Sequence, residues 1–491
     1  MATITEYFAG KKVLVTGATG FMGKVLIEKL LRSCPDVGLI YVIIRDKKGQ
    51  SAQERWDNLT KLELFNKLKE EIPGNLEKKV KVLNGDIFTE KFGLSKESYE
   101  DLKTSVSIVY HVAATVKFNE PIEIAMRTNV GGTRTAINFA LEVKNLEVFV
   151  HVSTAYSNCN MSEVEEKVYP PIMDWRQAMN IIKDTDPSTL KIITKKFISP
   201  MPNTYVFSKH LAEQVVNETK GKIPIVIFRP SIVISSWKGA YPGWIDNANG
   251  PTGMFIGMAK GVVRVQLADE DATPDYMPVD VAINALIIAS WKKGRTHNLK
   301  EKLTVSIYNS CTGSKNITLK ELRELCLGLQ DKFPIMQVLW YPRVQVTKNE
   351  SVYRIASFFK HFLPALTIDT ILMVLKKPPL LLPIQKKVMN ATLALKYFTL
   401  RKWTFHNDNF TSLLKEITPE DYEAFDFNYE NGDVEEFLRV CIEKGRHLLL
   451  NETTQNIEMA KRKHFWLYFL DVSLKIVFAL GLTYILYSWC F

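Results

Sequence analysis

Residues 12–32, KVLVTGATGFMGKVLIEKLLR, decide the fold of this 491-residue chain. The stretch opens with a β-branched run, KVLVT, that predicts a short strand, and it closes with KVLIEKLLR, whose apolar residues recur at helical spacing. Glycines stand between them at 17, 20 and 23. A strand, a glycine turn and a helix in this order are typical of the first βαβ unit of a dinucleotide-binding sheet.

The glycine turn predicts a phosphate-binding loop. Glycines allow a sharp turn, a close approach of a pyrophosphate to the backbone, and tight packing of the helix on the strand. The helix N-terminus then offers unpaired N–H groups and the positive end of its dipole. We expect cofactor contacts from Thr16, Gly17, Thr19, Gly20, Phe21 and Gly23.

The end of the second predicted strand, residues 39–44 (LIYVII), bears on which dinucleotide binds. An NAD-selective site usually places an acidic residue there to hold the ribose hydroxyls. This chain has Arg45, followed closely by Lys47 and Lys48, which favours the 2′-phosphate of NADPH. Asp46 could turn inward instead and keeps NADH open as the alternative.

Three more apolar runs, at residues 80–83, 108–112 and 148–152, continue the alternation of strand and helix. Over about 150 residues this pattern predicts an α/β fold, a Rossmann-type doubly wound parallel sheet. Ligands of such sheets bind beyond the carboxyl ends of the strands. The residues that follow these strands are therefore expected to line the cofactor crevice: Asp86 and Ile87 beside the adenine, and Ala113, Ala114 and Thr115 under the ribose and pyrophosphate.

A candidate catalytic set follows. Tyr205 and Lys209 are four residues apart in a predicted helix and so share one face. A nearby ammonium stabilises phenolate and lowers the pKa of a tyrosine, which makes a proton donor for neutral pH. Thr154, or its neighbour Ser153, can supply a second hydrogen bond to an oxyanion. We interpret His111 and His151, on buried strands, as hydrogen-bonded structural residues.

These motifs together resemble an extended short-chain dehydrogenase/reductase. The resemblance rests on TGATGFMG, GDIF, HVAATV, HVSTAY and YVFSK, which occur in that order. More narrowly, the chain resembles the alcohol-forming fatty acyl-CoA reductases, through FVHVSTAYSN at 149–158, FRPS at 228–231, GPTGM at 250–254 and DYMPVD at 275–280. The likeness continues through HFLPALTID at 361–369 and FTLRKWTF at 398–405, and so covers nearly the whole chain.

The resemblance implies reduction of a long-chain acyl-CoA to a primary alcohol with two NADPH, by way of a bound aldehyde. It implies that Tyr205 donates the proton, that Thr154 shares the oxyanion, that Lys209 also binds the nicotinamide ribose, and that Pro230 and Ser231 contact the cofactor. A smaller substrate subdomain and a helical C-terminal domain are expected as well. The expected ranges are a reductase domain over 1–345, the helical domain over 346–455, and a membrane anchor over 465–491.

Two other functions stay open. A hydroxysteroid or sugar-nucleotide dehydrogenase would share the core motifs, although only a thioester reductase releases CoA. A non-catalytic NADPH-binding scaffold at a membrane is the alternative from another class. The presence of Tyr205, Lys209 and Thr154 together argues against the scaffold.

The amino-acid composition limits the class of protein and the kinds of ligand that this chain can bind. With 46% hydrophobic and 24% charged residues, the chain is neither disordered nor a polytopic membrane protein. The net charge of +10, with no long basic block, suits a phosphorylated cofactor, a nucleotide-bearing substrate or an anionic membrane as well as nucleic acid, and charge alone does not choose among them. The partners we expect are an acyl-CoA substrate and a membrane, with no nucleic acid. The six cysteines form no CxxC pair and have no histidine cluster nearby, so neither a metal site nor a disulfide framework is expected.

The C-terminus predicts a membrane anchor. Residues 476–491 carry no charge, and extension back to Phe465 adds only Asp471 and Lys475 as charged interruptions. The basic run at 461–463 before it favours a single-pass protein with a cytosolic body, at the endoplasmic reticulum or alternatively the peroxisome. A buried or interfacial helix is the other reading. The apolar runs within 357–383 are either packed helices or an acyl-binding or interfacial patch.

Overall fold

The chain folds into two units, each built from separate stretches of sequence. The computed structural model describes residues 2–313, 316–429 and 432–490. Unit 1 comprises Met1–Pro242, Asp275–Asn316 and Trp403–Gly432; unit 2 comprises Gly243–Pro274, Ile317–Lys402 and Asp433–Phe491. The chain therefore leaves unit 1 and returns to it twice.

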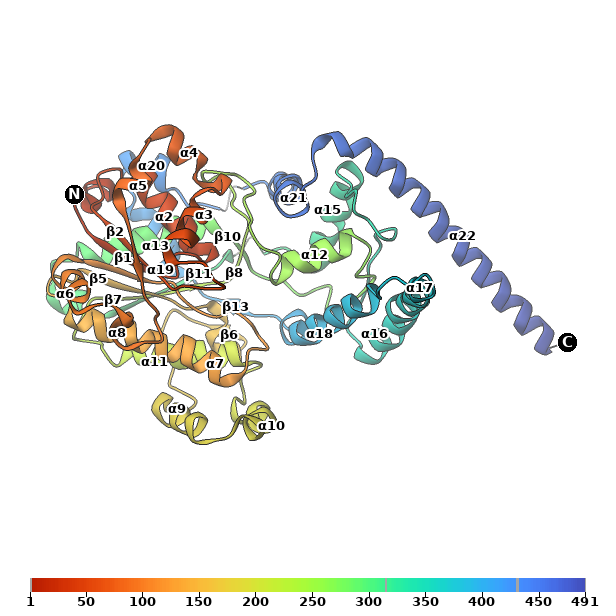
Figure 1. Ribbon diagram of the computed structural model, residues 1–491, viewed down its shortest axis with the longest axis horizontal. Coiled ribbons are helices and arrows are strands. Elements are labelled where there is room, and N and C mark those ends of the chain that lie inside the picture. Colours follow the sequence, from red (N-terminus) through yellow and green to blue (C-terminus); the bar gives the residue numbers. More distant parts are fainter. Residues whose placement is uncertain (1, 314–315, 430–431, 491) are drawn as a thin grey trace. The chain divides into compact units, whose positions relative to one another are not determined.

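A seven-stranded parallel sheet forms the centre of unit 1 (Figure 1). Its strand order is β11-β7-β5-β4-β1-β2-β3, which reverses direction beside β1 as in a doubly wound fold. The strands are β1 (Val13–Thr16), β2 (Ile40–Ile44), β3 (Val80–Asn84), β4 (Ile108–His111), β5 (Val148–Val152), β7 (Ile225–Pro230) and β11 (Val305–Ser310). The predicted fold class is confirmed.

Helices cover both faces of this sheet (Figure 1). On one face lie α2 (Phe21–Ser33) and α13 (Val279–Gly294), and on the other lie α8 (Gly132–Glu142) and α11 (Thr204–Asn217). Because both faces are covered, strands β1, β2, β4, β5 and β7 are buried along their whole length. The core includes Leu14, Val109, Phe149 and Ile227 from the strands and Phe139 from α8.

Shorter helices complete unit 1. They are α1 (Ile4–Phe8), α3 (Ala52–Thr60), α4 (Asn66–Glu71), α5 (Asn75–Lys79), α6 (Lys96–Ser105), α7 (Ile122–Met126), α9 (Trp175–Asp184), α10 (Pro187–Phe197) and α14 (Leu299–Lys302). A π-helical turn, Arg127–Gly131, joins α7 to α8 without a break. The short β8 (Ile232–Ile234) and β10 (Tyr276–Pro278) pair beyond the end of β7.

The last part of unit 1 comes from far along the sequence. There β13 (Thr404–Phe405) pairs with β6 (Glu163–Val164), and α19 (Asp408–Ser412) and α20 (Pro419–Phe425) follow. The Glu166 carboxylate accepts N–H groups from Asn309 at 2.9 Å and Phe410 at 3.0 Å, which ties this segment to β11. The domains expected from the sequence are continuous ranges, whereas each unit combines separate stretches of the chain. The reason is that contacts between residues distant in sequence define the units.

Unit 2 is mostly helical. Its helices are α12 (Pro251–Ala259), α15 (Leu319–Lys332), α16 (Glu350–Ser357), α17 (Leu363–Val374), α18 (Leu381–Thr399), α21 (Val434–Leu450) and α22 (Ile457–Cys490). A two-stranded sheet of β9 (Val265–Leu267) and β12 (Gln345–Thr347) carries its small core, where Val265 and Leu267 pack on Tyr353. The Lys-Lys-Pro-Pro sequence at 376–379 separates α17 from α18, as its prolines predict.

Two helical stretches of unit 2 are long and apolar enough to cross a membrane. One is Glu350–Val374, with a mean hydropathy of 1.2. The other is Thr454–Trp489, with a mean hydropathy of 1.8 and only 6% of its most apolar window buried. The second stretch includes the long helix α22, which contains the anchor predicted from the sequence (Figure 1).

Candidate active site

The glycine loop between β1 and α2 has the shape that a dinucleotide requires. Gly17 has a φ of +79°, and a Cβ atom there would lie 2.6 Å from the backbone nitrogen of Ala113. A Cβ atom on Gly23 would lie 2.3 Å from the Gly17 carbonyl oxygen. Gly20 begins the 13-residue helix α2 with no side-chain cap, so its first N–H groups are available to a phosphate. These residues fit the pyrophosphate of NAD(P).

A cluster of positive charge follows β2. The Arg45 guanidinium is half exposed, lies 3.4 Å from the Asp86 carboxylate, and stands 5.2 Å from the centre of the Phe88 ring. Arg127 lies at the same 5.2 Å distance from that ring. Partial burial, and then Arg45 with other nearby cations, lowers the pKa of Lys47. Such a group of cations suits an anionic ligand.

Asp46, the residue that kept NADH open, points to other partners. Its carboxylate accepts the backbone N–H of Ala52 at 2.8 Å, at the start of α3, and the side-chain amide of Asn84 at 3.1 Å. Both oxygens are therefore engaged within the protein. Arg45, the residue directly after β2, is therefore the side chain that could contact a ribose or its 2′-phosphate.

The segment after β4 is fixed by a residue that the sequence reasoning missed. Asn129, in the π-helical turn, accepts the backbone N–H of Thr115 at 2.9 Å and donates to the Thr115 carbonyl at 3.2 Å. It also donates to the Ser208 hydroxyl on α11 at 2.9 Å. Asn129 thus ties the predicted cofactor segment 113–115 to the helix of Tyr205. The signal that could have found it is an asparagine two residues before the Gly131-Gly132 pair.

Tyr205 and Thr154 meet although 50 residues separate them. Thr154 is the second residue after β5, which ends at Val152. Tyr205 lies in the first turn of α11, where the Asn203 side chain caps the helix by accepting the Val206 N–H at 2.9 Å. The Thr154 hydroxyl hydrogen-bonds to the Tyr205 phenol. The buried Lys209 ammonium donates to the Val152 carbonyl at 2.6 Å, two residues before Thr154. The three predicted catalytic residues therefore lie together.

Their protonation differs in one respect from the expectation. Burial raises the pKa of Tyr205 to about 12, and the hydrogen bond with Thr154 only partly opposes it. Burial also lowers the pKa of Lys209 to about 8, with Glu213 acting in the opposite direction. The pKa of the tyrosine is thus raised and not lowered, because the effect of burial is larger than that of the Thr154 hydrogen bond. Tyr205 keeps its proton at neutral pH, as a donor must.

Ser153, the other candidate hydroxyl, is hydrogen-bonded to Glu213. It donates to the Glu213 carboxylate at 2.5 Å, and Ser157 donates to the same oxygen at 3.0 Å. Arg229 forms a buried ion pair with Glu213 at 2.7 Å. The charged partner and the hydroxyl donors lower the pKa of Glu213 despite its burial. Ser153 therefore belongs to a buried network behind the site, and Thr154 alone of the pair is bonded to Tyr205.

The two strand histidines behave differently. His111 is hydrogen-bonded on both ring nitrogens, to Thr16 at 2.8 Å and to Thr133 at 3.1 Å, which confirms its predicted structural role. Burial lowers the pKa of His111 to about 3. His151 stacks on His111 with ring centres 5.5 Å apart, and neither of its ring nitrogens has a hydrogen-bond partner. For His151 the predicted hydrogen bonding was wrong.

The remaining predicted cofactor residues lie at the same edge of the sheet, beyond the strand ends. Thr16 ends β1 with its hydroxyl bonded to His111, and Ile87 packs on Gly132 of α8. Pro230 ends β7, and the buried Ser231 follows beside the Asp275 carboxyl. Among the described residues, no group of three or more His, Cys, Asp or Glu side chains could hold a metal ion.

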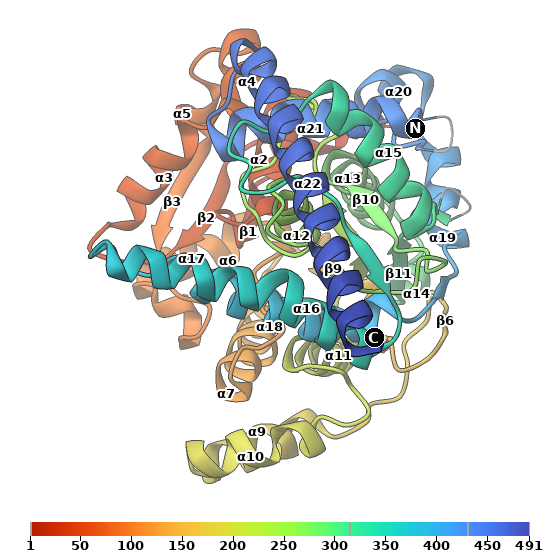
Figure 2. The same ribbon diagram turned by 90° about the vertical axis from the view of Figure 1, so that its right-hand side faces the viewer.

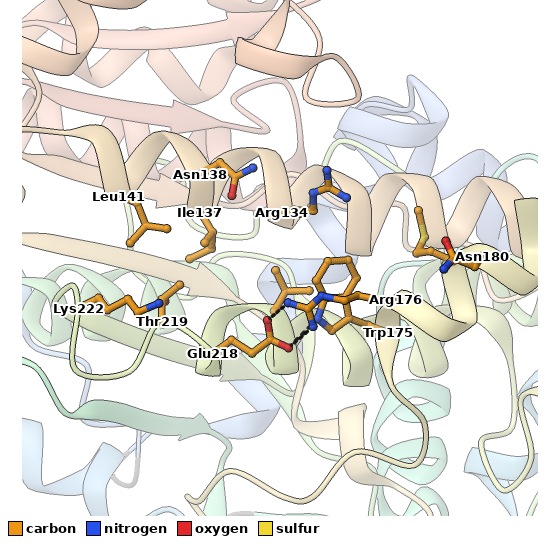
Figure 3. Close-up of a pocket in the computed structure, with 12 residues that line it drawn as sticks. Arg134, Ile137, Asn138, Leu141, Trp175, Arg176, Asn180, Glu218, Thr219 and Lys222 are labelled. Atoms are coloured by element: carbon orange, nitrogen blue, oxygen red, sulfur yellow. Dashed lines mark hydrogen bonds and ion pairs between the residues drawn. The ribbon is translucent and has the colours of Figure 1, made fainter.

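A separate surface groove of about 510 Å³ lies between α8, α9 and the C-terminal half of α11 (Figure 3). Trp175 and Arg176 are among the residues that line it, and Arg176 makes two hydrogen bonds to Glu218, at 2.7 and 2.6 Å (Figure 3). None of the predicted cofactor or catalytic residues lines this groove.

Comparison with known proteins decides the family. Two family models, each described as male sterility protein, match residues 15–286 and 360–452. Fatty acyl-CoA reductase 1 of Xenopus laevis is 38% identical over 465 residues, which cover 94% of this chain and 89% of that protein. The chain belongs to the fatty acyl-CoA reductase family. This acyl-CoA reductase is also 35% identical to the Drosophila melanogaster fatty acyl-CoA reductase wat, over 98% of its own length and 92% of the relative.

Solved structures agree with the fold of the reductase. The reductase domain of a nonribosomal peptide synthetase from Mycobacterium tuberculosis matches with a TM-score of 0.59 at 16% identity, covering 89% of this chain and 92% of that one. A UDP-glucuronic acid 4-epimerase from Bacillus cereus, solved with NAD, matches with a TM-score of 0.51 at 15% identity, covering 90% of this chain and 99% of that chain. These structures show the fold alone. It is the fatty acyl-CoA reductase relatives that leave the steroid, sugar-nucleotide and scaffold alternatives not favoured.

Proposed function

We propose that this acyl-CoA reductase uses NADPH to reduce a long-chain fatty acyl-CoA to the primary alcohol. The observation that carries the proposal is the meeting of Tyr205, Thr154 and Lys209 beyond the end of β5, beside a glycine loop that fits a dinucleotide. The family supplies the acyl-CoA substrate. The chemistry that follows assigns a task to each of these side chains.

NADPH, when bound, supplies the hydride that reduces the thioester carbonyl carbon. Tyr205 donates its proton to the carbonyl oxygen as negative charge develops there, and the Thr154 hydroxyl donates a hydrogen bond to the same oxygen. The Lys209 ammonium, on the same face of α11, stabilises the phenolate left behind. The product of this step is a hemithioacetal.

Breaking the carbon–sulfur bond of the hemithioacetal releases CoA as its thiol and leaves an aldehyde. The aldehyde carbonyl then occupies the position that the thioester carbonyl had. Tyr205 and Thr154 act on its oxygen as before, with a second hydride and a second proton, to give the alcohol. The same three residues therefore serve both reductions.

The direct test is a stoichiometry. Purified protein is incubated with a long-chain acyl-CoA and NADPH while nicotinamide absorbance, free thiol and extracted lipid are measured together. We expect two NADPH oxidised for each thiol released, with fatty alcohol recovered. One NADPH per thiol with aldehyde as the product would contradict alcohol formation, and no thiol release at any chain length would contradict the acyl-CoA substrate.

The preference for NADPH rests on the half-exposed Arg45 and on the engagement of Asp46 with Ala52 and Asn84. We expect Arg45→Ala to raise KM for NADPH by about 10- to 100-fold and to leave KM for NADH within about twofold, because the lost contact is to the 2′-phosphate. Initial rates with each cofactor measure this. Lys144→Ala, on the surface after α8, is the control substitution.

We propose further that α22 anchors the reductase in a membrane as a single pass, with the body in the cytosol. The exposed apolar residues of α22 and the basic run at 461–463 support this orientation. The endoplasmic reticulum is the first compartment to test and the peroxisome the second, by imaging the full-length chain against markers of both.

A further inference from the structure

We infer that unit 2 binds the membrane through a second surface besides α22. This α17 surface is the exposed apolar side of α16, of the π-helical turn Phe358–Phe362, and of α17. Six of its side chains, each more than half exposed, are Ile355, Phe358, Phe359, Ile371, Val374 and Leu375. The inference rests on the proposed membrane association and not on the reductase chemistry.

A buried contact holds α22 against the rest of unit 2. Asp471 in this helix is buried; its carboxylate accepts the Trp340 indole N–H at 2.7 Å and pairs with the Arg264 guanidinium at 3.2 Å. The uncharged part of α22 begins at Ile476, five residues or roughly 7 Å further along the helix at about 1.5 Å per residue. A membrane that α22 enters at this point therefore lies close to the surface of unit 2.

The α17 surface begins beside the Asp471 contact. The His361 Nε2 atom accepts the backbone N–H groups of Arg264 at 2.8 Å and of Val265 at 3.2 Å, and Arg264 is the residue that holds Asp471. The Lys360 ammonium interacts electrostatically with Asp471 and Lys475 of α22. Arg264 therefore links the start of the α17 surface to α22, and Figure 2 shows α16, α17 and α22 on the side that faces the viewer.

The α17 surface lies on the membrane and does not cross it. Tyr353, His361 and Asp369 interrupt the stretch with buried side chains, so one side of it packs on unit 2. Asp369 accepts the N–H groups of Leu380 and Leu381, both at 2.9 Å, and of Leu382 at 2.8 Å, which fixes the start of α18. A helix that packs on one side and is apolar on the other is typical of an interfacial helix.

Charge identifies the occupant as an anionic lipid surface. Between residues 350 and 399 the chain has seven lysines and arginines against two acidic residues, the buried Asp369 and Glu350, which pairs with Arg354 and Lys396. Lys376, Lys377, Lys386 and Lys387 are all exposed. Basic side chains beside an apolar surface bind anionic headgroups while the apolar side chains enter the boundary of the hydrocarbon. A second copy of this chain would bring the same positive charges together and is disfavoured.

The first experiment uses the full-length chain. An environment-sensitive fluorophore is attached to the cysteine of the Phe359→Cys variant. The same label on Ile192→Cys, in α10 of unit 1, is the matched control. The native chain treated with the label gives the background from its own cysteines. With phosphatidylserine-containing vesicles we expect a blue-shifted signal at position 359, quenched by nitroxide lipids, and no change at position 192. A signal at 359 that stays water-like on bound protein would overturn the inference.

The second experiment removes the free part of α22. A chain that ends at Lys475 keeps the Asp471 contacts, and we expect it to float with phosphatidylserine vesicles but not with uncharged ones. Adding Phe359→Asp, Ile371→Glu and Val374→Glu should lower the bound fraction about tenfold, while Ile192→Glu leaves it unchanged. Thermal unfolding verifies that each variant is folded. Loss of flotation on truncation alone, or a dimer that the three substitutions dissociate, would overturn the inference, whatever the enzymatic activity.

Discussion

Thr154 and Tyr205 approach each other from a strand end and from the first turn of a helix, and their hydrogen bond forms in a buried site. The pKa of Tyr205 is raised to about 12, so in the proposed reaction the phenol gives up its proton only to a stronger base, the developing alkoxide. In that proposal Thr154 donates a hydrogen bond to the same oxygen. The proposed chemistry thus depends on two hydroxyl groups and one ammonium.

Removing the phenol oxygen should stop turnover and leave cofactor binding intact. We expect Tyr205→Phe to lower kcat by about 10²- to 10⁴-fold, because the proton donor is lost. The dissociation constant for NADPH, measured by fluorescence titration, should change by less than about twofold. Tyr422→Phe, at an exposed position, is the control. Turnover close to that of the native chain in the Tyr205 variant would remove this residue from the mechanism.

Lys209 should set the alkaline limit of the reaction. Its pKa is lowered to about 8, so the ammonium is present below that pH and is lost as the pH rises through it. We expect kcat/KM to fall above about pH 8, since this ratio reports groups of the free enzyme. Lys209→Met should lower kcat/KM at every pH and remove this alkaline limb. An unchanged limb in the variant would assign it to another group.

At the scale of elements, α11 is attached to the sheet by charge as well as by apolar packing. Glu213 on α11 pairs with Arg229 on β7, and Ser153 and Ser157 donate to the same carboxylate. Both charged side chains are almost completely buried. Because α11 also carries Tyr205 and Lys209, this network fixes the catalytic helix against the strands that end at the site.

Breaking this ion pair should be costly. We expect Arg229→Leu to lower the free energy of unfolding by about 3–5 kcal/mol, because the Glu213 carboxylate is left buried and uncompensated. Chemical denaturation followed by circular dichroism measures it. Arg176→Leu, which removes the exposed pair with Glu218, is the control and should cause little change. Equal losses in both variants would contradict a special role of the buried network.

The elements and most of the site could be predicted from sequence because their signals are local. The strand at 13–16 and the glycine loop follow each other directly in the sequence. Tyr205 and Lys209 are likewise only four residues apart in one helix. The role of Asn129, the partners of Asp46 and the choice between Ser153 and Thr154 could not be predicted. Each depends on contacts between segments distant in sequence, and burial, which raises the pKa of Tyr205, is itself a property of the folded chain.

At the scale of the whole molecule, the return of residues 403–432 to unit 1 has a measurable consequence. Phe410 in this segment is buried against Phe427 and Phe228, with ring centres 5.1 and 6.5 Å apart. We expect Phe410→Ala to lower the free energy of unfolding of unit 1 by about 3–5 kcal/mol through the cavity it leaves. Thermal unfolding of unit 1, detected through the loss of NADPH binding, measures this change. Tyr422→Ala, at an exposed position, is the control. A change no larger than in the control would show that the segment is dispensable.

Because unit 1 consists of three separate stretches of the chain, its parts are synthesised at different times. The sheet is complete in sequence once β11 has been made, yet its last covering segment begins at Trp403, after the ninety-two residues 311–402. At about 5–20 residues per second a ribosome needs roughly 5–20 s to produce them. During that interval the nascent chain carries an unfinished sheet together with the apolar α17 surface. We therefore expect a newly made chain of this reductase to expose apolar surface to chaperones or to its membrane until residues 403–432 have been made.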